Sequence, residues 1–258
     1  MIARGRAAGL LAALVTVSSV SVAQTGDAIP LVRHILGLDY ARVQRFHRVY
    51  DMVVITGDSV VSIGTRGVTL VEAMIADSTG DWMLVESRSG VVSSVDSILL
   101  ASDLRPLRWR STVGGATLDM LFSADSMTGT IRIGDATNHM TLAIPPDLVV
   151  SWAVAEMLAA LLPLAPDWAD SASALVMSVS GAAVEPSEVF VSGEDSVVVT
   201  PEAPARPCWV LAMRAGAKES RAWVDRETAE VLRVRMLLPS HVGAILEYRL
   251  RPQPTTEQ

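Results

Sequence analysis

Short turn sequences separate the hydrophobic runs of this chain, and their length limits the folds open to it more than any other feature. From residue 45 onward, runs of Val, Ile, Leu, Thr and Met are interrupted about every 8 to 12 residues by Gly, Asp or Ser. Several interruptions hold only two or three turn-forming residues: Ser78-Thr79-Gly80, Ser89-Gly90, Gly114-Gly115 and Asp125-Ser126. Such short connections join antiparallel neighbours, because a parallel crossover needs about a dozen residues or more. The chain therefore predicts an antiparallel meander and excludes a doubly wound sheet.

The predicted strands fall into two groups on either side of one helical segment. The first group covers residues 45–56, 66–76, 81–88, 91–101, 105–113, 116–124, 127–134 and 138–143. The second group covers residues 174–180, 187–192, 195–200, 206–214, 220–225, 230–238 and 242–250. Residues 127–134 alternate apolar and polar side chains, which predicts one buried and one solvated face there.

A single apolar helix is predicted between the two groups, over about residues 148–162. Asp147 follows two prolines and can cap the helix, and further prolines end it after Leu162. Ser151 and Glu156 are its only clear polar positions, so the helix should lie inside the fold. The predicted fold class is mainly β: an antiparallel curved sheet or open barrel with this helix at its centre.

The beginning of the chain has the pattern of a cleavable secretory signal. Arg4 and Arg6 precede an apolar run too short to span a bilayer, and Ser21-Val22-Ala23 suits cleavage after Ala23. The expected organisation is a signal peptide over 1–23, an N-terminal segment with a short helix over 24–44, a single β-rich domain over 45–250 and a disordered tail over 251–258. The predicted location is the periplasm or the extracellular space.

The net charge limits the classes of possible partner, and the cysteine content limits disulfides and lipid anchoring. Removal of Arg4 and Arg6 lowers the formal net charge from −7 to −9, which argues against nucleic acid and anionic membranes as partners. The lone Cys208 cannot form an internal disulfide, and no cysteine stands at the cleavage point to carry a lipid anchor. The mature chain is expected to have no transmembrane segment and to depend on its core for stability.

One segment resembles the start of the GDS-type esterases and lipases, in which Ser59 of Gly57-Asp58-Ser59 would be the nucleophile. That chemistry needs a histidine base oriented by an aspartate. Leu238 stands where the family places the aspartate relative to His241, and its Gly-x-Asn-Asp block is missing. Asp-Ser recurs at residues 195 and 196, so we interpret it as a turn that begins a strand.

Other reactive residue types form no recognisable site. The four histidines have no metal-ligand spacing, and the glycines near residue 60 match no nucleotide-binding loop. Cys208 lies in an apolar strand and is predicted to be a core thiol. These patterns predict no metal, no cofactor and no enzymatic activity.

A ligand site can be suggested from apolar and basic side chains. Tryptophan can line an apolar pocket and still address a polar ligand group. Arg108 and Arg110 should share one face of a strand, as either a solvated edge or an anionic headgroup site. The suggested ligand-binding residues are Trp109, Leu148, Trp152, Met157, Arg108 and Arg110.

Three stretches carry a family resemblance: Leu100 to Phe122 with Asp103-Leu104-Arg105-Pro106; Leu161-Leu162-Pro163-Leu164; and Arg221-Ala222-Trp223-Val224-Asp225 with Thr228 and Val231-Leu232-Arg233. Together they resemble a family of exported bacterial β-rich proteins defined as a domain of unknown function, over most of residues 45–250. The resemblance implies a location and a fold type and no catalytic residues. A more distant, fold-level similarity is to the periplasmic lipoprotein carriers, whose curved sheet shelters acyl chains.

Three functions are consistent with these features. The first is a non-enzymatic binding or carrier protein for a hydrophobic or lipid-like ligand in the cell envelope. The second is a structural or interaction module of the envelope, with a protein partner. The third is an esterase that uses Ser59.

Overall fold

The computed structural model describes residues 38–73, 81–145, 147–178, 181–215, 218–238 and 243–252. The predicted signal peptide, the predicted short helix before residue 37 and most of the predicted tail lie outside these residues.

Strands dominate the described chain. The elements in the first part of the chain are η1 (Tyr40–Arg42), β1 (Phe46–Thr56), β2 (Ser59–Glu72), β3 (Trp82–Gly90), β4 (Ser94–Leu100), β5 (Pro106–Val113), β6 (Ala116–Phe122), β7 (Ser126–Ile133) and β8 (Ala136–Ala143). They are followed by β9 (Leu148–Val149), α2 (Trp152–Ala159), β10 (Ala169–Ser178), β11 (Gly181–Val197), β12 (Arg206–Ala215), β13 (Lys218–Asp225), β14 (Val231–Leu237) and β15 (Ile245–Leu250).

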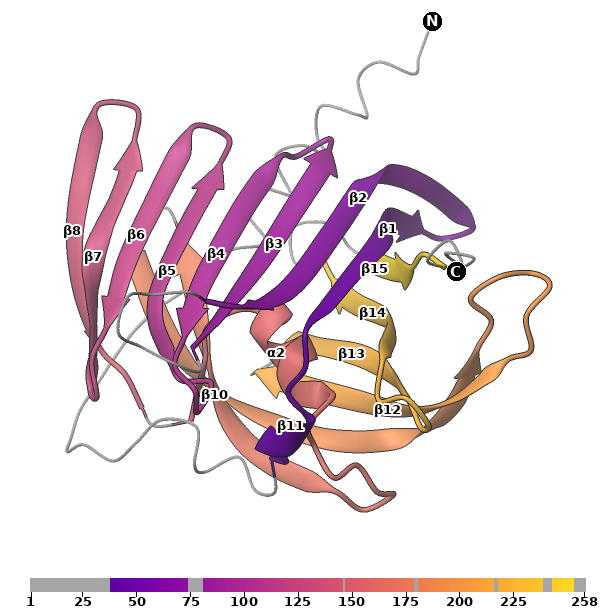
Figure 1. Ribbon diagram of the computed structural model, residues 1–258. Coiled ribbons are helices and arrows are strands. Elements are labelled where there is room, and N and C mark those ends of the chain that lie inside the picture. The colour runs from indigo at the N-terminus through magenta and orange to yellow at the C-terminus, as the bar shows by residue number, and fades with distance from the viewer. Residues whose placement is uncertain are drawn as a thin grey trace, which may run out of the picture.

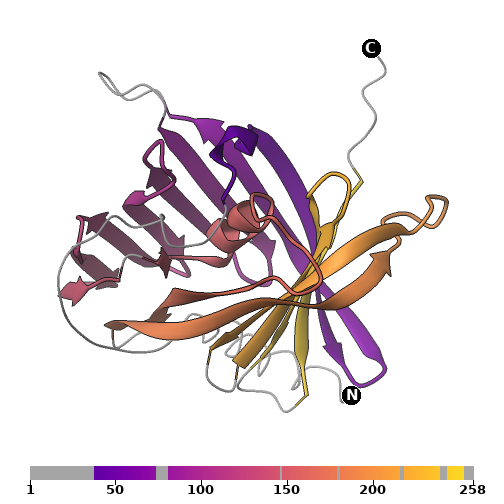
Figure 2. The same ribbon diagram turned by 90° about the horizontal axis from the view of Figure 1, so that it is seen from below.

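All described strands belong to one 15-stranded sheet, in the order β8-β7-β6-β5-β4-β3-β2-β1-β15-β14-β13-β12-β11-β10-β9. Every neighbouring pair is antiparallel except the short parallel pair of β9 and β10. The predicted meander is therefore confirmed. The sheet curves so that its two halves form two walls with α2 between them (Figures 1 and 2). Strands β1 to β8 form the N-terminal wall, and β9 to β15 form the C-terminal wall. The edge strand β8 approaches β11 without pairing to it, so the sheet is open and does not close into a barrel.

The helix prediction was wrong at both ends. Leu148 and Val149 pair with β10, and α2 begins only after Ser151, whose side chain accepts a hydrogen bond from the backbone N–H of Val154. Asp147, the expected cap, instead accepts a hydrogen bond from the hydroxyl of Ser173. Because Ser151 caps as well as Asp147 does and the β-branched Val149 and Val150 favour a strand, the helix is displaced along the chain.

Two strand predictions also needed correction. β2 begins at Ser59 rather than residue 66, directly after a two-residue turn in which Gly57 has φ +56°. β11 is one strand of 17 residues, where two shorter strands were expected. Glycines within both segments suggested turns, but tertiary pairing holds them in strands.

The inner face of the sheet forms the core. Leu84, Ile98, Trp109 and Met120 are successive cross-strand neighbours on β3 to β6, and all are buried. Burial of each such side chain contributes about 1.5–3 kcal/mol. The buried side of α2 packs on this core from between the two walls (Figure 2).

Two glycines allow β2 and β3 to approach closely near the middle of the sheet. Gly64 and Gly90 are paired and have φ values of +144° and +134°. A Cβ atom added to Gly64 would lie 2.0 Å from the carbonyl oxygen of Ser89. On the other side of Gly64, the register shift between Met52 and Val53 marks a bulge, which increases the local twist of the strand.

Candidate binding site

A buried arginine lies at the centre of the fold. Arg66 on β2 is fully buried, and its guanidinium carbon lies 5.5 Å from the ring centroid of Tyr50 and 4.6 Å from that of Tyr248. The two rings come from β1 and β15. Cation–π contacts of this kind are strongest where water is excluded, so three neighbouring strands are joined at one side chain.

Two buried carboxylates neutralise this arginine. Arg66 Nε donates to Glu86 Oε1 at 2.8 Å, and Arg66 Nη1 donates to Glu156 Oε1 at 2.5 Å. Glu86 also accepts a hydrogen bond from Arg88 Nε at 2.8 Å. Glu86 belongs to β3 and Glu156 to α2, so the ion pairs attach the helix to the N-terminal wall.

The two carboxylates titrate in opposite directions. Burial alone would raise the pKa of Glu86, but the charges of Arg66 and Arg88 outweigh it and lower this pKa to about 2. Burial raises the pKa of Glu156, and Arg66 only partly opposes it. Burial lowers the pKa of Arg66, but the two carboxylates more than reverse this effect and raise it. Glu156 is thus the acid of this cluster that takes up a proton more readily.

Two polar atoms of the cluster are buried with no hydrogen-bond partner among the described residues. They are Arg66 Nη2 and Glu156 Oε2. An unpaired buried polar atom costs about 1–3 kcal/mol. The Arg66–Glu156 pair therefore retains hydrogen-bonding capacity that the surrounding protein does not use.

An apolar cavity of about 50 Å³ lies between α2 and the C-terminal wall. Ala155, Leu158 and Ala159 line it from α2, and Glu156 borders it. The sheet side is formed mainly by apolar residues of β10 to β13: Ala172, Val189, Leu211, Met213 and Ala222. The cavity is about one third of the roughly 150 Å³ known to admit benzene, so a larger ligand requires α2 to move outward.

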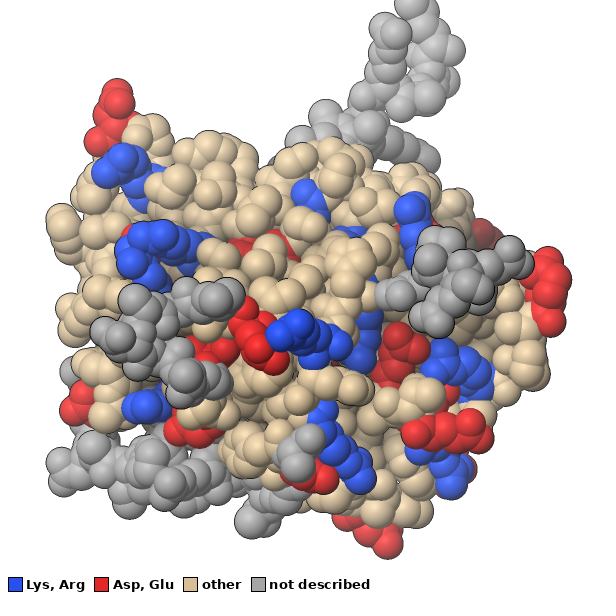
Figure 3. Space-filling view, in the orientation of Figure 1, with Lys and Arg blue, Asp and Glu red and all other residues tan. Residues whose placement is uncertain are grey.

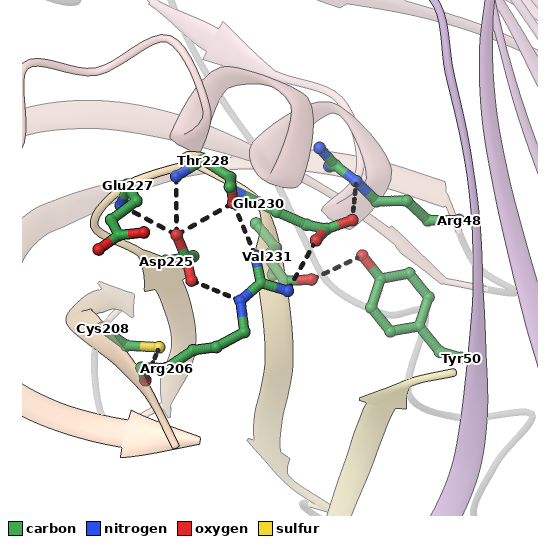
Figure 4. A network of polar contacts seen from close by, with 9 residues as sticks. All are labelled: Arg48, Tyr50, Arg206, Cys208, Asp225, Glu227, Thr228, Glu230 and Val231. Atoms are coloured by element: carbon green, nitrogen blue, oxygen red, sulfur yellow. Dashed lines mark hydrogen bonds and ion pairs between the residues drawn. The ribbon is translucent and has the colours of Figure 1, made fainter. Parts of the chain in front are cut away.

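A polar network ties the β13–β14 turn to β1 (Figure 4). Asp225 accepts hydrogen bonds from the backbone N–H groups of Glu227 and Thr228 and from Arg206 Nε. Arg206 also pairs with Glu230, which in turn pairs with Arg48 of β1. Asp225 and Thr228 belong to one of the stretches that carry the family resemblance, and both therefore stabilise the β13–β14 turn.

The residues suggested from the sequence are dispersed in the structure. Trp109 is buried and donates from Nε1 to Asp96 at 3.1 Å. Leu148 and Met157 are buried, whereas the side chain of Trp152 lies outside the described part of the chain. The lining of the cavity includes none of Trp109, Leu148 and Met157.

Arg108 and Arg110 do share a face of β5, as expected. Both donate to Asp119 of β6, at 2.6 Å from Arg108 Nη2 and 3.3 Å from Arg110 Nε. Asp119 was not singled out from the sequence, because only strand pairing brings it opposite Arg110. Basic and acidic side chains lie beside each other in this way over much of the face shown in Figure 3.

The remaining candidates have ordinary surroundings. Ser59 is exposed at the start of β2, and no hydrogen bond between its side chain and a histidine or aspartate is found among the described residues. Cys208 is buried, which confirms the predicted core thiol, and burial raises its pKa to about 11. Within the described ranges, no group of three or more His, Cys, Asp or Glu side chains could hold a metal ion. No described helix is both long and apolar enough to cross a membrane.

Comparison with known proteins gives a distant structural likeness. Neither a protein-family model nor a curated protein sequence matches the chain. Among solved structures, the crystal structure of the hypothetical lipoprotein YmcC from Escherichia coli (K12) is similar, with a TM-score of 0.36 and 12% sequence identity over 89% of this chain and 92% of that one. Because this TM-score and this sequence identity are low, the likeness says nothing about the chemistry of the site, which follows from its side chains alone.

Proposed function

We propose that this is an exported, non-enzymatic protein of the cell envelope that binds a small hydrophobic or lipid-like ligand between α2 and β10 to β13. The observation that carries the proposal is the apolar cavity at that position, bordered by Glu156. Ligand pockets are mostly apolar with a few placed polar groups. Here Glu156 Oε2 is the polar group with unused capacity.

Binding of a ligand larger than the cavity would begin with α2. This helix is short, and the Arg66–Glu156 pair is the described ion pair that attaches it to the sheet. Its other attachment is apolar packing by residues such as Met157 and Leu158. An apolar ligand could replace that packing, so outward movement of α2 enlarges the cavity without breaking the sheet.

The binding proposal is tested with purified, delipidated protein and the apolar dye 1-N-phenylnaphthylamine. Ala155→Leu fills part of the cavity. It should weaken dye binding by about tenfold or more, because the larger side chain displaces the equivalent of two to three buried methylene groups of the dye. Ala143→Leu on the exposed edge strand β8 is the matched control and should leave binding unchanged. Absence of dye binding, together with no co-purified apolar molecule by mass spectrometry, would remove the proposal.

The export part of the proposal rests on the sequence of residues 1–23 and on the resemblance to exported β-rich proteins. N-terminal sequencing of protein from the periplasmic fraction should begin at Gln24. Recovery of the uncleaved chain in the cytoplasm would contradict export and leave the binding test unaffected.

An envelope interaction module is the second candidate, and the edge strand β8 favours it. Among the described strands, β8 pairs only with β7, and most of its residues are exposed. An open edge offers unpaired backbone groups to an added strand from a partner. Cross-linking from a cysteine placed at Thr137 should then capture an envelope protein, whereas a cysteine at Val198 should not.

A further inference from the structure

Four arginines meet on the outer face of β13, β14 and β15. Arg221 lies directly opposite Arg235, and Arg233 lies directly opposite Arg249. Neighbouring strands are about 4.8 Å apart, and residues two apart along a strand are separated by about 6.8 Å. The four residues, named here the arginine face, therefore occupy one compact block of the sheet.

The alternation of each strand places these side chains on the outside. Ala222, Val234 and Tyr248 are buried on the inner face, where Tyr248 contacts Arg66. Their sequence neighbours must point to the opposite face, because successive side chains of a strand alternate. The side chains of Arg221 and Arg249 are about half exposed.

The arginine face keeps unused positive charge. Like charges directly opposite each other destabilise a sheet. Two glutamates offset part of this cost: Glu247 pairs with Arg235 and Arg249 and is only 1% exposed beneath them, and Glu219 pairs with Arg221. Arg233 contacts the ring of Trp223 at 5.2 Å and has no ion pair among the described residues. An external anion would complete this arrangement.

An apolar row borders the arginine face on the same side of the sheet. Leu237 is paired with Ile245, Ile245 with Ile55, and Ile55 with Val60. Arg233, Arg235 and Leu237 are spaced two residues apart along β14, so their side chains lie on the same face of the sheet. Leu237 and Val60, at the two ends of the row, are each 53% exposed. Exposed apolar side chains beside a charged cluster indicate an interaction surface rather than a solvated face.

We propose that the arginine face and its apolar row dock the protein onto the surface of an anionic phospholipid bilayer. Arginine guanidinium groups match phosphate oxygens, and the apolar row would enter the boundary between headgroups and acyl chains. A soluble polyanion would use the arginines but would leave the apolar row in water. The net charge, −7 for the full sequence and −9 without Arg4 and Arg6, repels anionic surfaces at long range, so docking depends on this short-range patch.

The test is co-sedimentation of the purified protein with vesicles of phosphatidylcholine, with and without phosphatidylglycerol. Arg221→Gln/Arg233→Gln removes two charges, leaves both partners of the buried Glu247 in place, and leaves Glu219 paired with Arg214. It should weaken partitioning onto the anionic vesicles by about 30-fold, since each interfacial arginine contributes about fivefold. Leu237→Ser should also weaken partitioning, without changing the charge.

Matched controls have the same chemistry elsewhere on the surface. Arg132→Gln removes an exposed arginine of β7, and Val198→Ser removes an apolar side chain that is 54% exposed. Every variant shares the same N-terminal residues, so any contribution from them cancels. Equal losses in the controls, no preference for anionic vesicles, or binding to soluble dextran sulfate that is unaffected by Leu237→Ser would each overturn the proposal.

Discussion

Arg66 on β2 and Glu156 on α2 form a buried ion pair, although 90 residues separate them in the chain. The guanidinium also contacts the rings of Tyr50 and Tyr248, so one side chain joins the helix, the N-terminal wall and the centre of the sheet. Its contribution is to hold α2 in place over the cavity. The first prediction follows from removal of this charge.

Replacement of Arg66 by Met should lower the free energy of unfolding by about 3–5 kcal/mol, because Glu86 and Glu156 would be left buried without their shared partner. Urea unfolding followed by circular dichroism measures the effect. Arg132→Met is the control, since an exposed arginine should change stability by no more than about 0.5 kcal/mol. Equal stability of the two variants would show that the buried cluster does not hold the fold.

The stability of the protein should fall in acid because of Glu86. Its pKa drops from an ordinary value of 4.5 to about 2, so its stabilising effect is complete above pH 4.5 and is lost as the pH falls towards 2. The loss amounts to roughly 3 kcal/mol. Glu86→Gln should flatten the dependence of the free energy of unfolding on pH in this window.

Glu156 should act in the opposite direction. Its pKa is raised by burial, so the folded protein takes up this proton more readily than the unfolded chain does, and acidification favours folding at this site. Glu156→Gln should therefore make the acid loss steeper than in the unmodified protein. Urea titrations between pH 6 and about 3 distinguish the two variants, and parallel curves would contradict both assignments.

Asp225 should be a strong determinant of the β13–β14 turn. It accepts hydrogen bonds from two backbone N–H groups, from the Thr228 hydroxyl and from Arg206, and these bonds lower its pKa against the effect of burial. Asp225→Asn should cost about 2–3 kcal/mol, since hydrogen bonds to a charged group contribute more than neutral ones. Asp58→Asn, in the exposed β1–β2 turn, is the control and should change stability little.

Gly64→Ala should be more damaging than Gly114→Ala. Both glycines have positive φ, but the new Cβ at Gly64 would collide with the carbonyl of Ser89, whereas at Gly114 nothing lies within 4 Å. We expect a loss of about 1 kcal/mol at Gly114 from backbone strain alone and at least about 3 kcal/mol at Gly64. Thermal unfolding of the two variants side by side measures the difference.

Ser59→Ala should leave stability within about 0.5 kcal/mol, because Ser59 is an exposed turn-flanking residue. Hydrolysis of p-nitrophenyl butyrate should be the same for the variant and the unmodified protein. Loss of turnover in the variant alone would instead support the esterase interpretation.

Turn chemistry and alternation predicted the architecture well, since both act over a few residues. Gly114-Gly115 marks a hairpin in the sequence, and the structure places a hairpin there. The start of α2 was missed because Ser151 and Asp147 are equally good caps, and only pairing with β10 decides between them.

The buried cluster and the arginine face depend on register, which short sequence windows do not contain. Glu156 was visible as the lone acid of an apolar helix, but its partner Arg66 is fixed only when β1, β2 and β15 have aligned. The same holds for Arg221, Arg235 and Arg249, which come from three strands. The net charge of the chain can be counted from the sequence, but it does not reveal a local excess of arginines on one face of the sheet.

The first and last strands of the described sheet, β1 and β15, are neighbours at its centre, whereas its two edges come from the middle of the chain. Tyr50 contacts the distant Val231 and Arg66 contacts Tyr248, so the core is completed only by the final strands. Such distant pairings slow folding, because a long loop must close before they form. A chain built in this way cannot complete its core until β15 has been synthesised, so every strand before β15 waits for the last one.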